Sequence, residues 1–148
     1  MMDLASTYYT VGRLEEALSM ERDVYSGSLS LFGEEHKYTL LAANNYANTL
    51  LELKGLEEAK TLTRKTIPLA RRILGEGATL TLRTRWNYAR ALYEDPAATL
   101  DDLREAVTTL EEIERTARRV LGRAHPLTES MEGGLRDARV VLRRRVTT

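Results

Sequence analysis

The sequence predicts an all-α fold, specifically a right-handed superhelical solenoid built from antiparallel pairs of helices. The first observation behind this prediction is a repeat, because GEEHKYTLLAANNYA at 33–47 returns 42 positions later as GEGATLTLRTRWNYA at 75–89. Self-similarity with a fixed period of about 20–50 residues is typical of solenoids, whose units bury their apolar faces against one another. The second observation is that apolar residues within a unit recur with the period of an amphipathic helix.

The repeat register divides one expected domain, 1–148, into units. Leu-Glu-Glu-Ala occurs at 14–17 and again at 56–59, in the same 42-residue register. The register also reaches LGRAHPLTE at 121–129, provided that five residues are inserted after Leu92, and the segment EDPAATLDD supplies them. We therefore expect a first unit shortened at its N-terminus, two full units and a terminal helix, at 1–32, 33–74, 75–121 and 122–146.

The first unit is expected to contain only part of its first helix, because 3–11 is too short for a complete one. A turn is expected at the Gly-x-Leu-Glu-Glu-Ala stretch that begins at Gly12. In the second unit, the apolar residues of 38–53 fall on one arc of a helix. Lys54 and Gly55 interrupt that helix, and Gly55 is expected to supply a left-handed residue.

The remaining helices follow the same plan. A second helix is expected over 56–74, where Pro68 should introduce a kink or a local break. The third unit should place helices near 79–93 and 99–121, with a longer turn between them. Proline is favoured at the first helical position, so Pro126 is expected to open a last helix over about 126–146. The adjacent glycines 133 and 134 lead us to expect a bend there, or a helix that begins only after them.

Composition restricts the possible classes of function. The 22 basic and 22 acidic side chains cancel, so net charge gives no argument for nucleic acid or membrane binding. The absence of cysteine excludes disulfides, thiolate nucleophiles and Cys-based zinc sites. No stretch approaches the roughly 20 apolar residues of a membrane span, and the start MMDLAST lacks the pattern of a signal peptide. We therefore expect a soluble cytoplasmic protein, or a piece of one.

The chain resembles the 42-residue tetratricopeptide repeats found in kinesin light chains and in many unrelated multidomain proteins. The resemblance covers about 1–130 and is specific for the repeat class. Three departures from the family pattern are Lys37 in place of the usual proline, GAT at 77–79, and a last helix without the Asn pair. The stretches that carry the resemblance are 12–17, 44–47, 55–59, 87–89 and 121–126.

A polar stripe adjoins the apolar arc on the first helix of each unit, and stacked first helices line the concave wall of a solenoid. These side chains should therefore converge on one groove. Asparagine amides donate and accept hydrogen bonds at once, and arginines pair with carboxylates. The resemblance implies that Asn45 and Asn87 hold the backbone of a bound peptide. The expected groove residues are Leu41, Asn45, Asn48, Arg83, Asn87 and Arg90, with Asn44, Trp86 and Ser6 as a possible rim.

A structural interpretation of the same residues stays open. An asparagine in a helix can bond the next turn or a helix of the neighbouring unit, and units of shared ancestry repeat it without any ligand. Trp86 and the tyrosines are more typical of packing than of a ligand platform. His36 and His125 are expected to serve turns, and the repeated Glu pairs reflect the solenoid, so we expect no catalysis, metal or cofactor.

The sequence therefore predicts a protein-interaction scaffold that binds a short extended or partly acidic peptide in its concave groove. One alternative is a section of a longer repeat array, or a module that pairs end to end into a homodimer through exposed repeat ends. A third hypothesis, nucleic-acid contact, is disfavoured because no reading motif accompanies the basic residues. Those residues, expected on the convex side, are Lys60, Arg64, Lys65, Arg71 and Arg72.

Overall fold

The computed structural model describes residues 4–147, with side chains from residue 10 onward, and these residues form six helices and no strand. The predicted all-α class is therefore confirmed, and the expected helix limits agree with the structure to within two residues from 37 onward. None of these helices is long and apolar enough to cross a membrane. The helices are α1 Leu4–Phe32, α2 Lys37–Glu52, α3 Leu56–Leu74, α4 Thr79–Tyr93, α5 Leu100–Val120 and α6 Pro126–Thr147.

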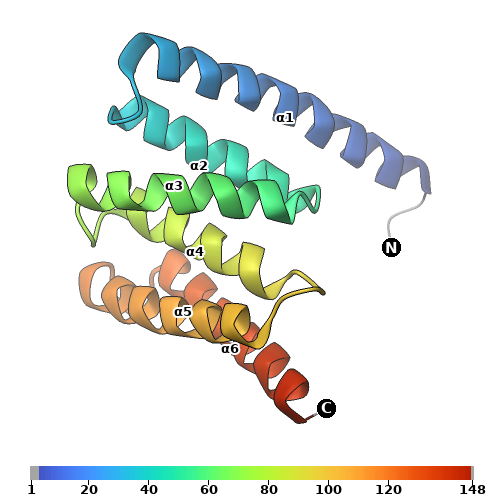
Figure 1. Cartoon of the computed structure of the whole chain (residues 1–148), viewed down its shortest axis with the longest axis vertical. Helices are drawn as coiled ribbons and strands as arrows, with labels where there is room; N and C mark the ends of the chain where they lie inside the picture. Colours follow the sequence, from blue (N-terminus) through green and yellow to red (C-terminus); the bar gives the residue numbers. More distant parts are fainter. Residues whose placement is uncertain (1–3, 148) are drawn as a thin grey trace.

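Consecutive helices pack against each other and stack in a single direction from α1 to α6 (Figure 1). In addition, α2 contacts α4, and α4 contacts α6. α2, α4 and α6 are each the first helix of a repeat unit. They therefore form one continuous row, with α4 in its middle. This arrangement is the one that the repeat register predicts, because a fixed sequence spacing becomes a fixed step in space.

The core consists of two clusters that follow the row. Around α2 and α3, one cluster is built on small and aliphatic residues, while the other joins α4, α5 and α6. Alanine recurs at the contact positions because a small side chain lets neighbouring helices approach closely. The first cluster holds Ala43, Ala47, Leu50, Leu51, Ala59, Leu62 and Ala91. The second includes Leu82, Leu92, Ala106, Leu110, Ile113, Met131 and Ala138.

Glycines at the junctions between units adopt backbone angles that other residues rarely do. Gly33, Gly75 and Gly122 follow α1, α3 and α5, with φ of 82°, 97° and 97°. A residue in this left-handed region lets the chain reverse after a helix, and glycine has no Cβ to oppose it. The backbone conformation therefore explains why both copies of the repeat have glycine at the aligned positions 33 and 75.

The turn between α2 and α3 differs from the expectation. Lys54, and not Gly55, is the left-handed residue, with φ of 65°. Gly55 has an ordinary φ of −81°, and its N–H donates to the carbonyl of Leu50 at 2.7 Å. A Cβ on Gly55 would lie 3.1 Å from Cδ2 of Leu50. The glycine is therefore used for close approach to Leu50, and the prediction that it supplies the left-handed conformation was wrong.

The first unit also differs from the expectation, because α1 runs without interruption through Gly12. The expected turn at this position does not form. In the second unit, Lys54 forms the turn and the N–H of Gly55 donates to the carbonyl of Leu50, whereas Gly12 lies inside the continuous helix α1. A continuous helix keeps the backbone hydrogen bonds that a turn would remove.

Two other expected interruptions are also missing. α3 continues through Pro68, so the alternative of a local break is excluded. α6 begins at Pro126 and continues through Gly133 and Gly134, so the expected late start was wrong. Close packing explains the second case, because a Cβ on Gly134 would lie only 2.9 Å from Nε1 of Trp86 in α4. Glycine therefore allows α6 to approach α4.

Candidate functional site

The row formed by α2, α4 and α6 carries a hollow of about 480 Å³. Residues from α2, from α4 and from the start of α6 line it, so three successive units contribute to one site. The structure thus brings together most of the residues that the polar stripe predicts for a groove. The lining consists of Asn44, Asn45, Asn48, Arg83, Trp86, Asn87, His125, Pro126, Leu127 and Ser130. We call this hollow the concave groove.

The asparagines of the concave groove have different environments. Nδ2 of Asn87 donates to Oδ1 of Asn44 at 3.0 Å, and both side chains are buried. The hydroxyl of Thr84 lies 3.3 Å from the same Oδ1. The structural interpretation therefore holds for this pair, which joins α2 to α4. Asn45 and Asn48, by contrast, are exposed and line the groove.

The floor of the groove is formed by Trp86, which packs against the second core cluster. Its Nε1 is buried and has no hydrogen-bond acceptor among the described residues. The guanidinium of Arg90 lies 5.7 Å from the centre of the Trp86 ring and also pairs with Glu94 at 2.8 Å. Such a cation over an indole face is attracted by the ring electrons. Arg90 therefore fixes Trp86 and does not line the groove.

Other predicted groove residues lie elsewhere or differ in character. Arg83 lines the groove, is exposed and makes no ion pair within the described part of the chain. Leu41 is 45% exposed but lies outside the groove lining. Ser6 belongs to the turns of α1 whose side chains lie outside the described residues. Arg83 is thus the basic residue whose charge remains available to a ligand.

The sequence analysis missed the lining residues that the last turn and α6 contribute, among them His125 and Ser130. Nδ1 of His125 accepts the N–H of Leu127 at 3.1 Å, and His36 accepts the N–H of Tyr38 in the same way at 3.1 Å. The expectation that both histidines serve turns is confirmed. His125 also borders the groove, because the turn that it caps brings α6 against α4.

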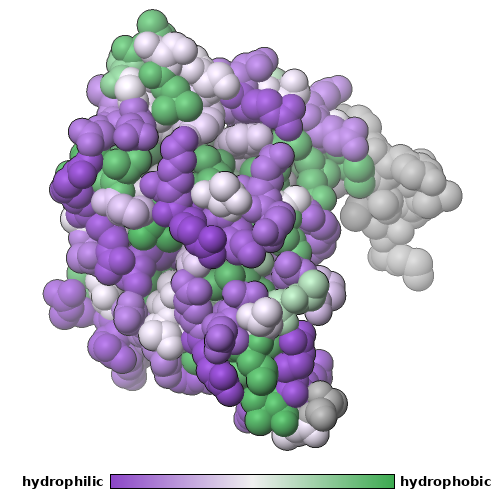
Figure 2. Space-filling view, in the orientation of Figure 1, coloured by the Kyte–Doolittle hydropathy of each residue, from purple (hydrophilic) through white to green (hydrophobic). Residues whose placement is uncertain are grey.

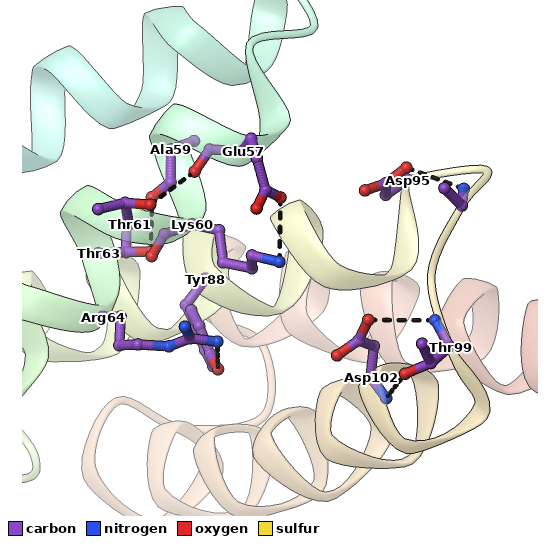
Figure 3. Close-up of polar contacts among 11 residues, drawn as sticks. Glu57, Ala59, Lys60, Thr61, Thr63, Arg64, Tyr88, Asp95, Thr99 and Asp102 are labelled. Atoms are coloured by element: carbon purple, nitrogen blue, oxygen red, sulfur yellow. Dashed lines mark hydrogen bonds and ion pairs between the residues drawn. The ribbon is translucent and has the colours of Figure 1, made fainter.

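Figure 3 shows two of the predicted basic residues of α3, Lys60 and Arg64, beside their partners Glu57 and Tyr88. Lys60 pairs with Glu57 at 3.0 Å, and this hydrogen bond raises the pKa of Lys60. Arg64 donates to the hydroxyl of Tyr88 at 3.3 Å, and burial raises the pKa of Tyr88. That hydroxyl in turn donates to Glu105 at 2.6 Å.

The two basic residues at the end of α3 are paired in the same manner. Arg71 contacts Glu76 at 2.5 Å, and Arg72 pairs with Glu35. A cation that already has a carboxylate partner releases fewer counterions when it meets a phosphate, so it contributes less to nucleic-acid binding. These pairs favour a structural role for Lys60, Arg71 and Arg72. In the part of the chain that the structure describes, no cluster of three or more acidic or histidine side chains is placed to hold a metal.

Comparison with known proteins agrees with the helical repeat fold. A family model described as Tetratricopeptide repeat matches residues 1–37 and 39–77. A solved crystal structure of nearly identical TPR-like repeats, in a Podosopora anserina chain named for kinesin light chain, is similar over 97% of this chain and 85% of that chain. Its TM-score is 0.53 and its sequence identity 18%, so this similarity bears on the fold alone. Among curated proteins, none matches the sequence significantly.

Proposed function

The chain belongs to the tetratricopeptide repeat family, and on that premise we propose that its concave groove binds a short, extended and partly acidic peptide of a partner protein. The repeat architecture in general supports a role as a protein-interaction scaffold. The observation that carries the finer proposal is the concave groove itself. There, the exposed amides of Asn45 and Asn48 lie beside the guanidinium of Arg83, which has no ion-pair partner among the described residues.

The two exposed amides are suited to a peptide backbone. Each amide offers a carbonyl acceptor and an NH₂ donor, so it can pair with both groups of one peptide unit. Asn45 and Asn48 lie on the same face of α2, because residues three apart are neighbours on a helix. An extended segment has unpaired N–H and C=O groups at regular intervals. We therefore assign backbone recognition to Asn45 and Asn48.

Asn87 has a mixed role in this proposal. Its Nδ2 is already bonded to Asn44, but its Oδ1 accepts no hydrogen bond within the described part of the chain. It can therefore accept a peptide N–H while it continues to join α2 to α4. Because Asn44 fixes its orientation, Asn87 binds without losing side-chain freedom, which lowers the entropic cost of association.

Charge preference is assigned to Arg83. It is exposed at the groove, and no described carboxylate pairs with it. Arginine pairs with carboxylates in a bidentate geometry, so an Asp or Glu of the peptide is the expected contact. Trp86 and Leu127 supply apolar surface beside it. The expected affinity for one short motif is micromolar.

Selection from a display library of random peptides tests the proposal. We expect selected peptides to be enriched in Asp and Glu, and to bind Asn45→Ala/Asn48→Ala at least about 10-fold more weakly, the equivalent of roughly 1.4 kcal/mol. Both positions are exposed, so the melting temperature should stay unchanged. The matched control is Thr61→Ala, an exposed position on the convex helix α3. Peptides that bind the double variant as tightly as the parent protein would contradict the assignment.

The preference for acidic peptides has its own test. Replacing Arg83 by Glu should reverse the preference, so that selection on this variant yields basic peptides. Binding of the acidic peptides to the parent protein should also weaken as salt is raised, because exposed charges are screened. An unchanged preference in Arg83→Glu would assign charge recognition to another residue.

A further inference from the structure

The outer face of α1 carries a seam of apolar and small residues. Its members alternate in steps of four and three residues, which places them on one side of a helix. Met20, Val24 and Leu31 in this seam are 68%, 58% and 78% exposed. Leu18 and Tyr25 lie on the other side of α1 and pack against the core cluster of α2 and α3. The seam consists of Ala17, Met20, Val24, Gly27 and Leu31.

The equivalent positions of the next unit are buried. In the 42-residue register, Met20 aligns with Leu62 and Val24 with Thr66, and these two residues of α3 are 9% and 3% exposed. Leu62 belongs to a core cluster with Ala47 and Leu50 of α2. In the next unit, α2 therefore packs on this face of α3. No described element of the chain packs on the equivalent face of α1 (Figure 1).

The opposite end of the stack is different. By the register and its insertion, Ala47 and Leu50 of α2 align with Arg136 and Arg139 of α6. Both arginines are exposed. A solenoid needs such a polar outer face at an end that meets solvent. The α6 end thus has the character of a cap, and the α1 end does not. Figure 2 shows the corresponding apolar surface over the C-terminal end of α1, at the top of the view.

Four of the five seam residues pair with each other by reversal of the helix, while the fifth, Leu31, falls opposite Arg13. Met20 and Val24 lie symmetrically about position 22, as do Ala17 and Gly27. A second α1 laid antiparallel on the first would therefore place Met20 against Val24, and Ala17 against Gly27. The small pair lets the two helices approach, while the large pair fills the centre of the contact. A contact of this type is isologous and closes after two copies.

We propose that the partner of this face is a second copy of the chain, and that two α1 helices pack antiparallel about a two-fold axis beside residue 22. The self-complementary spacing favours a second copy over an unrelated helix. The polar α6 end favours a closed pair over head-to-tail growth. The dimer leaves the concave groove of each copy open, because the groove is formed by α2, α4 and α6.

Crosslinking between cysteine variants tests the antiparallel register. The chain contains no cysteine, and a Cβ on Gly27 would have nothing within 4 Å, so single cysteines can be introduced cleanly. In the proposed dimer, position 17 meets position 27 of the partner, while like positions stay about 15 Å apart. An equimolar mixture of Ala17→Cys and Gly27→Cys should therefore form a disulfide-linked dimer under mild oxidation, and neither variant alone should. Crosslinking of a single variant, or none in the mixture, would overturn the proposal.

Solution mass as a function of concentration gives the second test. The parent chain should show a dimer that Met20→Glu weakens at least about 100-fold, because the charge would be buried without a partner. Val146→Glu, which alters a 59% exposed apolar residue at the other end of the stack, should leave the dimer unchanged. A parent chain that remains monomeric at high micromolar concentration would overturn the proposal and assign this face to another partner.

Discussion

The end pair of helices, α1 and α2, and the interior pair, α3 and α4, carry matching residues in different environments. Asn45 of α2 is exposed, while Asn87 of α4, which is 42 residues later, is 3% exposed. Likewise, Met20 of α1 is 68% exposed and the aligned Leu62 of α3 is 9% exposed. Place in the repeat therefore fixes where a side chain points, and place in the stack decides whether it meets solvent or a neighbour.

The largest difference in the free energy of unfolding should come from the aligned residues Leu62 and Met20. Leu62→Ala removes a buried side chain that packs on α2, and should lower the free energy of unfolding by about 2–5 kcal/mol. Met20→Ala alters the aligned residue, which is exposed, and should change the free energy of unfolding by less than about 0.5 kcal/mol. Chemical denaturation at low protein concentration, where pairing through α1 does not contribute, measures both. Equal losses would mean that the two pairs of helices have the same environment.

The contact of α4 with α6 should give the next largest effect. A Cβ on Gly134 would lie 2.9 Å from Nε1 of Trp86, so Gly134→Ala should push α6 from α4 and cost about 1–3 kcal/mol. Gly133→Ala is the matched control, since the nearest atom to its Cβ would be a flexible guanidinium nitrogen of Arg136 at 3.7 Å. This variant should gain about 0.5–1 kcal/mol, because glycine disfavours a helix interior. Thermal unfolding that shows the opposite order would contradict the close packing of Gly134.

The periodic spacing of apolar residues and the repeat register made most of the fold predictable. Apolar residues at the helical period and the 42-residue register place five of the six helices. These signals are local, because they depend on which residues one turn of a helix brings together. The turn expected at Gly12 and the late start expected after Gly134 were wrong. The second depends on a distant contact. Gly134 is matched to Trp86, which lies 48 positions earlier in the chain.

The sequence predicts which helices line the groove, but not the contacts between the side chains that line it. Equal spacing gathers Asn45, Asn48, Arg83 and Asn87 along one wall, as the polar stripe indicates. The hydrogen bond from Asn87 to Asn44 depends on the distance between α2 and α4, which no single helix encodes. His125 was missed for a similar reason, because it enters the groove through the packing of the last turn.

The smallest effect on stability, and the sharpest test of the comparison, comes from the two aligned asparagines. Asn87→Ala removes the donor to Asn44 and should cost about 0.5–1.5 kcal/mol, since the hydroxyl of Thr84 remains near the same acceptor. Asn45→Ala alters an exposed side chain and should change stability by less than about 0.5 kcal/mol. With the peptides selected on the parent protein, Asn45→Ala should lower the affinity without a change in melting temperature. Asn87→Ala should lower both the affinity and the melting temperature. If Asn45→Ala destabilises the fold as much as Asn87→Ala, then α2 has a neighbour in solution at its outer face, and the exposed amide is not a recognition group. The same pair of variants therefore decides whether the repeated asparagine binds a ligand, holds adjacent units together, or changes from one role to the other along the stack.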